Sequence, residues 1–228
     1  MAVTDWIMNN WLEVFGAVSG IIYVFLEIRQ NIWLWPVGIV TSAVYIIVFF
    51  TSKFYADMSL QGYYLAMSCI GWYWWLRGAG QGAQGAGHRA QNEEQKTGGL
   101  RDEETERLKV TRLKPVTGLL LTSVFILLYA GTWYILSRFT DSPVPEWDSF
   151  ITSLSVIATW MLARKVYEHW YLWIAVNAAS VMIFIARGLY PTVILYCVYL
   201  AMSFAGLKVW KKSISEEPRA VRREPHAS

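Results

Sequence analysis

Seven stretches of predominantly apolar residues limit what this chain can fold into more than any other feature. A helix needs about 20 such residues to cross the hydrocarbon core of a bilayer. The stretches lie at 8–28, 33–51, 57–76, 116–137, 149–164, 169–186 and 190–209. The fifth is the shortest, and a short amphipathic segment is the alternative interpretation there. Only 16% of the 228 residues are charged, whereas soluble domains carry about 25%. The pattern predicts an all-α membrane protein with seven transmembrane helices.

Two polar segments divide the chain. Residues 78–114 open with a Gly-, Gln- and Ala-rich run that is typical of a flexible linker, and they continue as a highly charged segment. A polar, basic tail follows the last apolar stretch. The predicted organisation is therefore a first group of three helices (1–77), a cytoplasmic loop (78–114), a single helix (115–140), a second group of three helices (141–210) and a tail (211–228).

The basic residues are distributed unevenly between the two sides of the predicted bundle. About 17 of the 20 Lys and Arg residues fall on one side, and the other side holds Lys53, Arg138 and Arg187. Loops on the cytoplasmic side of a membrane carry an excess of Lys and Arg. We therefore expect the C-terminus in the cytoplasm and the N-terminus outside.

The two groups of three helices repeat one another at an offset of 135 residues. The sequence Tyr-Leu-Ala-Met-Ser at 64–68 recurs at 199–203, and about 14 of the 47 positions in 29–75 are identical to their counterparts. Identical pairs include Arg29 and Arg164, Trp35 and Trp170, Gly71 and Gly206, and Trp75 and Trp210. Four crossings separate corresponding helices, so both copies run in the same direction. The pattern predicts two parallel three-helix repeats joined by a linker helix, an architecture in which some transporters bind substrate between the repeats.

Residue patterns typical of enzymes do not occur in the sequence. Cys69 and Cys197 lie in apolar stretches, and the His residues show no metal-ligand spacing. Glu27 is expected to cap or solvate the end of a span, and His169 is expected at the membrane interface. The sequence thus predicts no catalytic residue, metal or cofactor, and it favours a facilitator over an energised pump.

Three residues of the sixth stretch form the strongest candidate for a binding site. Trp170, Trp173 and Asn177 are spaced by three and four residues, which places them on one helix face. An Asn amide both donates and accepts hydrogen bonds, and Trp is the best aromatic partner for a cation. The set suits a flat, hydrogen-bonding, cationic ring. The alternative is that the tryptophans lie at the interface and Asn177 serves helix packing.

Further candidates lie where the second, third and seventh stretches would converge between the repeats. These candidates are Asn31, Trp35, Tyr45, Gln61, Tyr64, Tyr196 and Tyr199. Core packing is the alternative role for each tyrosine, whereas a mid-span amide such as Gln61 needs a polar partner. Trp173 and Asn177 match the smaller Gly38 and Ser42 of the first repeat. We therefore expect an asymmetric site in which the second stretch leaves room for the ligand.

Together these motifs resemble the PnuC family of bacterial vitamin transporters. The resemblance rests on Asn-Ile-Trp-Leu-Trp-Pro-Val-Gly at 31–38, Tyr-Ala-Asp-Met-Ser-Leu-Gln at 55–61, Gly-Trp-Tyr-Trp at 71–74 and the Trp-x-x-Trp-x-x-x-Asn set at 170–177. It covers nearly all of the membrane portion. It implies two three-helix bundles with a linking helix, similar to sugar facilitators of the SWEET type, and a homotrimer in the bacterial inner membrane.

The resemblance also implies a function. A transporter of this kind would take up nicotinamide riboside by facilitated diffusion, and a cytoplasmic kinase would phosphorylate the substrate and trap it for NAD synthesis. Trp170, Trp173 and Asn177 would contact the substrate, with Gln61 as a further contact. Thiamine or another vitamin is the alternative cargo. A non-transporting membrane receptor, whose polar residues serve packing alone, is the alternative class. Lipid is an expected partner and nucleic acid is not.

Overall fold

The computed structural model describes residues 11–51, 55–77, 110–140 and 143–221. The described part is all-helical, as predicted, and a single isolated bridge between Thr111 and Val166 is its only extended pairing. The helices are α2 (Trp11–Ile28), α3 (Leu34–Thr51), α4 (Tyr55–Leu76), α6 (Pro115–Phe139), α7 (Pro145–Ala163), α8 (His169–Ala186) and α9 (Tyr190–Val221). α9 extends into the segment assigned to the tail. Most of the 78–114 loop lies outside the described residues.

Local sequence explains where several helices begin and end. α6 and α7 both start with a proline, Pro115 and Pro145, at a position where the missing amide proton does no harm. The turns that follow α2 and α7 each contain a residue in the left-handed region, Gln30 with φ 52° and Lys165 with φ 51°. Such a residue commonly ends a helix. Gln30 and Lys165 are 135 residues apart, so the two turns occupy corresponding positions in the sequence.

The outer surface of the bundle is strongly apolar. Among the described residues, four segments are long and apolar enough to cross a membrane: Leu34–Thr51, Pro115–Phe139, His169–Ala186 and Tyr190–Ile214. α6 has no buried residue, and its Leu119, Leu127 and Phe139 side chains are each more than 70% exposed. Soluble monomers rarely expose apolar patches this extensive. The surface therefore indicates a protein that is surrounded by lipid and crosses the membrane several times.

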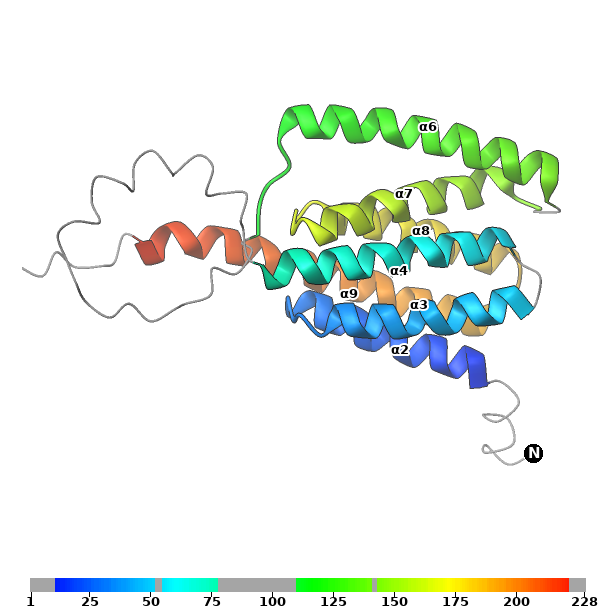
Figure 1. Ribbon diagram of the computed structural model, residues 1–228, viewed down its shortest axis with the longest axis horizontal. Coiled ribbons are helices and arrows are strands. Elements are labelled where there is room, and N and C mark those ends of the chain that lie inside the picture. Colours follow the sequence, from blue (N-terminus) through cyan, green and yellow to red (C-terminus); the bar gives the residue numbers. More distant parts are fainter. Residues whose placement is uncertain (1–10, 52–54, 78–109, 141–142, 222–228) are drawn as a thin grey trace, which may run out of the picture.

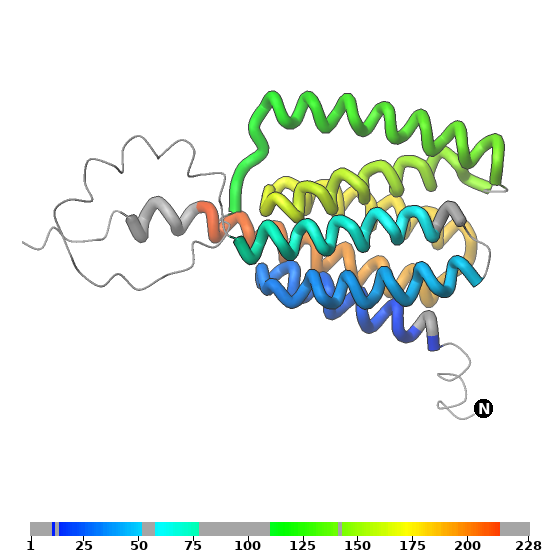
Figure 2. Tube along the Cα trace, viewed as in Figure 1, coloured from blue at the N-terminus to red at the C-terminus, as the bar shows by residue number. Residues whose placement is uncertain are grey.

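The helices pack side by side along one direction (Figures 1 and 2). Within the first group α3 packs against α2 and α4, and within the second group α8 packs against α7 and α9. Contacts of α4 with α7 and of α2 with α9 join the two groups. α6 lies along α7 at the edge of the bundle (Figure 1). The start of α2 and the end of α9 lie at opposite ends of the bundle (Figure 1).

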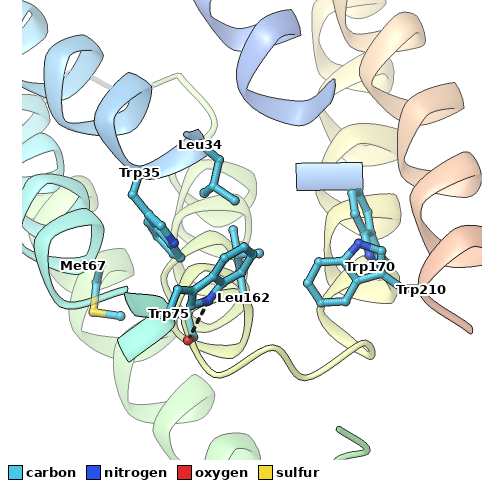
Figure 3. Close-up of a cluster of buried hydrophobic side chains, with 8 residues drawn as sticks. Leu34, Trp35, Met67, Trp75, Leu162, Trp170 and Trp210 are labelled. Carbon is cyan, nitrogen blue, oxygen red and sulfur yellow. Dashed lines mark hydrogen bonds between the residues drawn. The ribbon is translucent and has the colours of Figure 1, made fainter. Parts of the chain in front are cut away.

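A buried aromatic cluster closes the end of the bundle where α2, α4 and α7 finish and α3 and α8 begin. We call it the tryptophan end, defined by Trp35, Trp75, Trp170 and Trp210 (Figure 3). Trp35, Trp170 and Trp210 have no exposed surface, and Trp75 is 6% exposed. The packed core therefore lies near one end of the membrane span rather than at its middle.

Candidate functional site

The predicted face of α8 runs from the tryptophan end towards the middle of the bundle. Trp170 is fully buried, Trp173 is half-buried and Asn177 is 6% exposed. At about 1.5 Å of rise per residue, the face extends about 10 Å along the helix axis. Both tryptophans pack inside the protein, so neither is the lipid-facing interface residue that the alternative interpretation requires.

Trp170 occupies a site that a glycine of the neighbouring helix makes possible. A Cβ atom added at Gly206 of α9 would collide with the Trp170 indole. The first group shows the same arrangement, because a Cβ at Gly71 of α4 would collide with Trp35 of α3. Each of these rings meets a second tryptophan edge to face. The centroids lie 5.4 Å apart for Trp35 and Trp75, and 6.0 Å apart for Trp170 and Trp210.

The buried indole N–H groups fall into two sets. The Nε1 atoms of Trp75 and Trp210 donate to backbone oxygens, Trp75 to Ala163 at 3.2 Å and Trp210 to Glu27 at 3.1 Å (Figure 3 draws the first bond). The Nε1 atoms of Trp35, Trp170 and Trp173 are buried and find no acceptor among the described residues. A buried donor without a partner costs about 1–3 kcal/mol. These three donors are therefore available to a polar ligand that reaches them.

Asn177 connects α8 to α9 near the middle of the span. Its Nδ2 donates to the Ser203 hydroxyl at 3.1 Å, and that hydroxyl donates to the Tyr199 carbonyl oxygen at 2.8 Å. These bonds fix the amide and leave its oxygen, Oδ1, as the acceptor for another group. The mid-span Asn thus has a structural partner and retains capacity to bind a ligand.

Four predicted tyrosines come together between α3, α4 and α9. Tyr45 of α3, Tyr64 of α4, and Tyr196 and Tyr199 of α9 lie close enough to interact electrostatically. We call these four residues the tyrosine group. The rings of Tyr196 and Tyr199 are 5.7 Å apart.

Two glycines of α2 leave space for hydroxyls of the tyrosine group. A Cβ at Gly16 would collide with the Tyr45 hydroxyl, and one at Gly20 would collide with the Tyr199 hydroxyl. Residues from four helices therefore meet in one polar region between the two groups of helices.

The remaining predicted candidates have different surroundings. Asn31 is exposed in the turn between α2 and α3, where its side-chain oxygen accepts from the Trp33 amide at 3.0 Å. Trp35 belongs to the tryptophan end. Gln61 is half-buried on α4, one turn before Tyr64. Of these three, Gln61 is the one that lies next to the tyrosine group along its helix.

The expectations for Glu27 and His169 are wrong. Glu27 is 2% exposed and His169 is fully buried, and Glu27 Oε1 lies 2.9 Å from His169 Nε2. Neither residue is solvated at a helix end. The repeat contains the signal that could have identified them, because at the offset of 135 residues Glu27 matches Leu162 and His169 matches Leu34. Both leucines are fully buried, so a core position is the natural reading of their counterparts.

A separate hollow of about 200 Å³ lies at the other end of the bundle, between α7 and α8. Its lining residues are Val144, Trp147, Met182, Ile183, Ala186 and Arg187. None of them is a predicted site residue. Within the described ranges no three His, Cys, Asp or Glu side chains gather closely enough to hold a metal ion.

Comparison with known proteins gives consistent results. A family model described as nicotinamide mononucleotide transporter matches residues 10–212. The nicotinamide riboside transporter PnuC of Escherichia coli is 26% identical over 219 residues, 91% of this chain and 87% of that protein. The riboflavin/roseoflavin transporter RibM of Streptomyces davaonensis is 24% identical over 88% of this chain and 84% of its own length.

The fold also matches a solved structure. The crystal structure of the vitamin B3 transporter PnuC aligns with a TM-score of 0.65 and 22% sequence identity, and the alignment covers 93% of this chain and 87% of that one. The two chains therefore share their helical architecture over nearly their whole length.

Proposed function

Because the chain belongs to the nicotinamide mononucleotide transporter family, we propose that it takes up nicotinamide riboside by facilitated diffusion. The family consists of membrane transporters, so the chain is a transporter and not an enzyme, and the predicted relation to PnuC proteins is confirmed. Its apolar helices and its family make it a multi-pass protein of the bacterial inner membrane. Relatives in Escherichia coli and Neisseria mucosa are named nicotinamide riboside transporters, which supports this cargo.

The face of α8 that bears Trp170, Trp173 and Asn177 is the observation that carries the proposal. Nicotinamide riboside has a flat cationic pyridinium ring, a carboxamide and a ribose. Indole faces attract such a cation with about 0.5–2 kcal/mol. Asn177 Oδ1 would accept from the carboxamide NH2, and the unpartnered Trp173 Nε1 would donate to an oxygen of the ligand. Trp170 is fully buried, so its contact with substrate requires that the tryptophan end rearranges.

The ribose would be held by hydroxyl and amide groups of the other helices. The tyrosine group places phenol hydroxyls of α3, α4 and α9 between the two groups of helices. Gln61 lies next to this group on α4 and would add an amide. We assign Asn31 a structural role in the turn between α2 and α3, where its side-chain oxygen accepts from the Trp33 amide, and not a contact with the substrate.

We further infer that the helices form two parallel repeats with α6 as the linker, in a 3+1+3 arrangement like that of SWEET facilitators. Corresponding features support this arrangement. They are the left-handed residues Gln30 and Lys165, the tryptophan–glycine pairs Trp35–Gly71 and Trp170–Gly206, and the indole bonds of Trp75 and Trp210 across the two groups. A substrate site between the groups is typical of transporters built from repeats.

The remaining elements of the proposal concern energy, orientation and assembly. Facilitated diffusion needs no energy source in the carrier, and we propose that a cytoplasmic kinase traps the substrate by phosphorylation. The excess of Lys and Arg at the tryptophan end supports a cytoplasmic location for that end and for the C-terminus. We also propose a homotrimer, for which the apolar outer face of α6 offers one available surface.

Two other cargoes compete with nicotinamide riboside. Thiamine also contains a cationic aromatic ring, and the Streptomyces relative is named for riboflavin. A titration of purified protein with nicotinamide riboside, thiamine and riboflavin, followed by quenching of tryptophan fluorescence, separates these cargoes. We expect saturable quenching by nicotinamide riboside at the lowest concentration. Tighter binding of thiamine or riboflavin would reassign the cargo, and no response to any of the three would favour a membrane receptor.

A further inference from the structure

The Glu27–His169 pair joins the two groups of helices at the tryptophan end. Glu27 is on α2 and His169 begins α8, and their side-chain atoms Oε1 and Nε2 are 2.9 Å apart. The other ring nitrogen of His169, Nδ1, lies 2.7 Å from the Val166 carbonyl oxygen. Both side chains are shielded from solvent, at 2% and 0% exposure. The contact is thus buried, polar and placed between parts that must separate if this end opens.

The hydrogen-bond partners determine how many protons the pair holds. The Val166 carbonyl can only accept, so Nδ1 of His169 carries a hydrogen. An ionised carboxylate can also only accept, so the contact between Nε2 and Oε1 needs a second hydrogen on one of these two atoms. The closed pair is therefore either imidazolium with carboxylate or imidazole with carboxylic acid. Either form is neutral overall, and loss of the bridging proton leaves two acceptors facing each other and a buried negative charge.

Trp170 depends on this pair for its position. The His169 ring contacts both Trp170, with centroids 4.7 Å apart, and Trp210, with centroids 4.8 Å apart. The Trp210 indole also donates to the backbone oxygen of Glu27. Displacement of His169 or Glu27 therefore moves the contacts of both tryptophans.

Titratable and charged groups surround the pair on the packed elements. Tyr23 of α2 interacts electrostatically with Glu27, and Arg29, which follows α2, lies over the Phe25 ring at 4.5 Å. On α4, Tyr64 interacts with Tyr23. In the turn between α7 and α8, Arg164 lies over Trp74 and Lys165 over Trp75, while Glu168 accepts from the Leu113 amide at 3.0 Å. Lys208 and Lys211 of α9 are exposed. The hydrogen bond within the pair itself joins Glu27 Oε1 to His169 Nε2.

The other half of the molecule uses leucines at the corresponding positions. Leu162 matches Glu27 and Leu34 matches His169, and both leucines are fully buried in the cluster of the tryptophan end (Figure 3). An apolar contact therefore suffices to pack this end. Buried ion pairs can often be replaced by apolar residues without loss of stability. A polar pair at one of two equivalent places indicates a role that leucines do not supply.

We propose that Glu27 and His169 form a proton-bridged gate contact that holds the tryptophan end closed and positions Trp170, so that loss of the bridging proton opens this end. The proposal deepens the transport function, and it rests on that function only in assigning the opening to substrate passage. The opening releases one proton, so the open population rises by at most tenfold for each pH unit.

Cysteine labelling measures this opening without any substrate. In the full chain, Cys69 and Cys197 are replaced by Ser, and Ala163→Cys introduces a reporter at a fully buried position of the tryptophan end. The rate of maleimide labelling is measured between pH 5 and 9. The matched variant carries Glu27→Leu with His169→Leu, which copies the leucines of the other half. The labelling rate of the chain with the native pair is divided by that of the matched variant, and this ratio cancels the pH dependence of the thiol itself.

We expect a ratio near one at acidic pH and a rise by up to tenfold per unit as the pair loses its proton. A ratio that is independent of pH would overturn the proposal. Glu27→Gln provides a second variant if the double substitution fails to fold, because its amide donates to a neutral imidazole without a titrating proton. It should also label without the pH-dependent rise. Uptake of nicotinamide riboside is measured separately. A different cargo would not affect the labelling result, and a labelling ratio that is independent of pH would not affect the assignment of the cargo.

Discussion

Asn177 is the side chain on which recognition of the carboxamide depends most. Replacement by Leu keeps its approximate volume and removes the oxygen that would accept from the ligand. An unsatisfied buried polar group costs about 1–3 kcal/mol, and 1.4 kcal/mol is a factor of about ten in affinity. We therefore expect Asn177→Leu to weaken nicotinamide riboside binding at least tenfold in a calorimetric titration. Ser42→Ala, at the buried corresponding position of α3, is the matched control and should change the affinity less than threefold. Equal losses in both variants would remove Asn177 from the site.

Trp173 combines two properties that substitution can separate. Trp173→Phe keeps an aromatic face but removes the buried Nε1 donor, whereas Trp173→Leu removes both. A cation–aromatic contact contributes about 0.5–2 kcal/mol. We expect binding of nicotinamide riboside to weaken in the order wild type, Phe, Leu, with the step from Phe to Leu about threefold or larger. Affinities that are the same for Phe and Leu would show that the ring face does not hold the pyridinium.

Helix packing at the tryptophan end depends on two glycines. Gly71→Ala and Gly206→Ala each place a Cβ against a buried indole, and overpacking of this kind costs about 1–3 kcal/mol. We expect both variants to unfold at lower temperature in detergent, by similar amounts because the two contacts correspond. Gly131→Ala on α6 meets open space and should leave the unfolding temperature unchanged or raise it. A loss confined to one of the two glycines would argue against equivalent packing in the two halves.

The sequence predicts a helix well where the residues of that helix alone determine it. Length and apolarity alone located the seven helices of the described residues, because a bilayer imposes both on any segment that crosses it. The offset of 135 residues also pointed to Trp35 and Trp170, whose packing against glycines the structure then revealed. The environment of Glu27 was not predicted, because its burial depends on contacts of α2 with α8 and α9 that hydropathy does not encode. Asn31, which the sequence grouped with the candidate substrate contacts, is exposed in the turn between α2 and α3.

The whole molecule has an orientation that can be tested in intact cells. Arg187 and Lys211 are exposed. Arg187 follows the end of α8, whereas Lys211 follows Trp210 of the tryptophan end, where α8 begins. In a chain whose two cysteines are replaced by Ser, Arg187→Cys should react with a membrane-impermeant thiol reagent added outside the inner membrane. Lys211→Cys should react only after the membrane is made permeable. The reverse pattern would place the tryptophan end, and with it the Glu27–His169 pair, on the outside.

Uptake by liposomes that contain the purified chain tests the central claim most directly. We predict saturable entry of labelled nicotinamide riboside down its concentration gradient, without nucleotide, and faster entry when the interior is negative because the substrate is a cation. Exchange of labelled for unlabelled substrate across the membrane should be rapid, and Trp173→Leu with Asn177→Leu should abolish both processes in a protein that still folds. Entry no faster than into empty liposomes, or entry that survives the double substitution, would contradict the account.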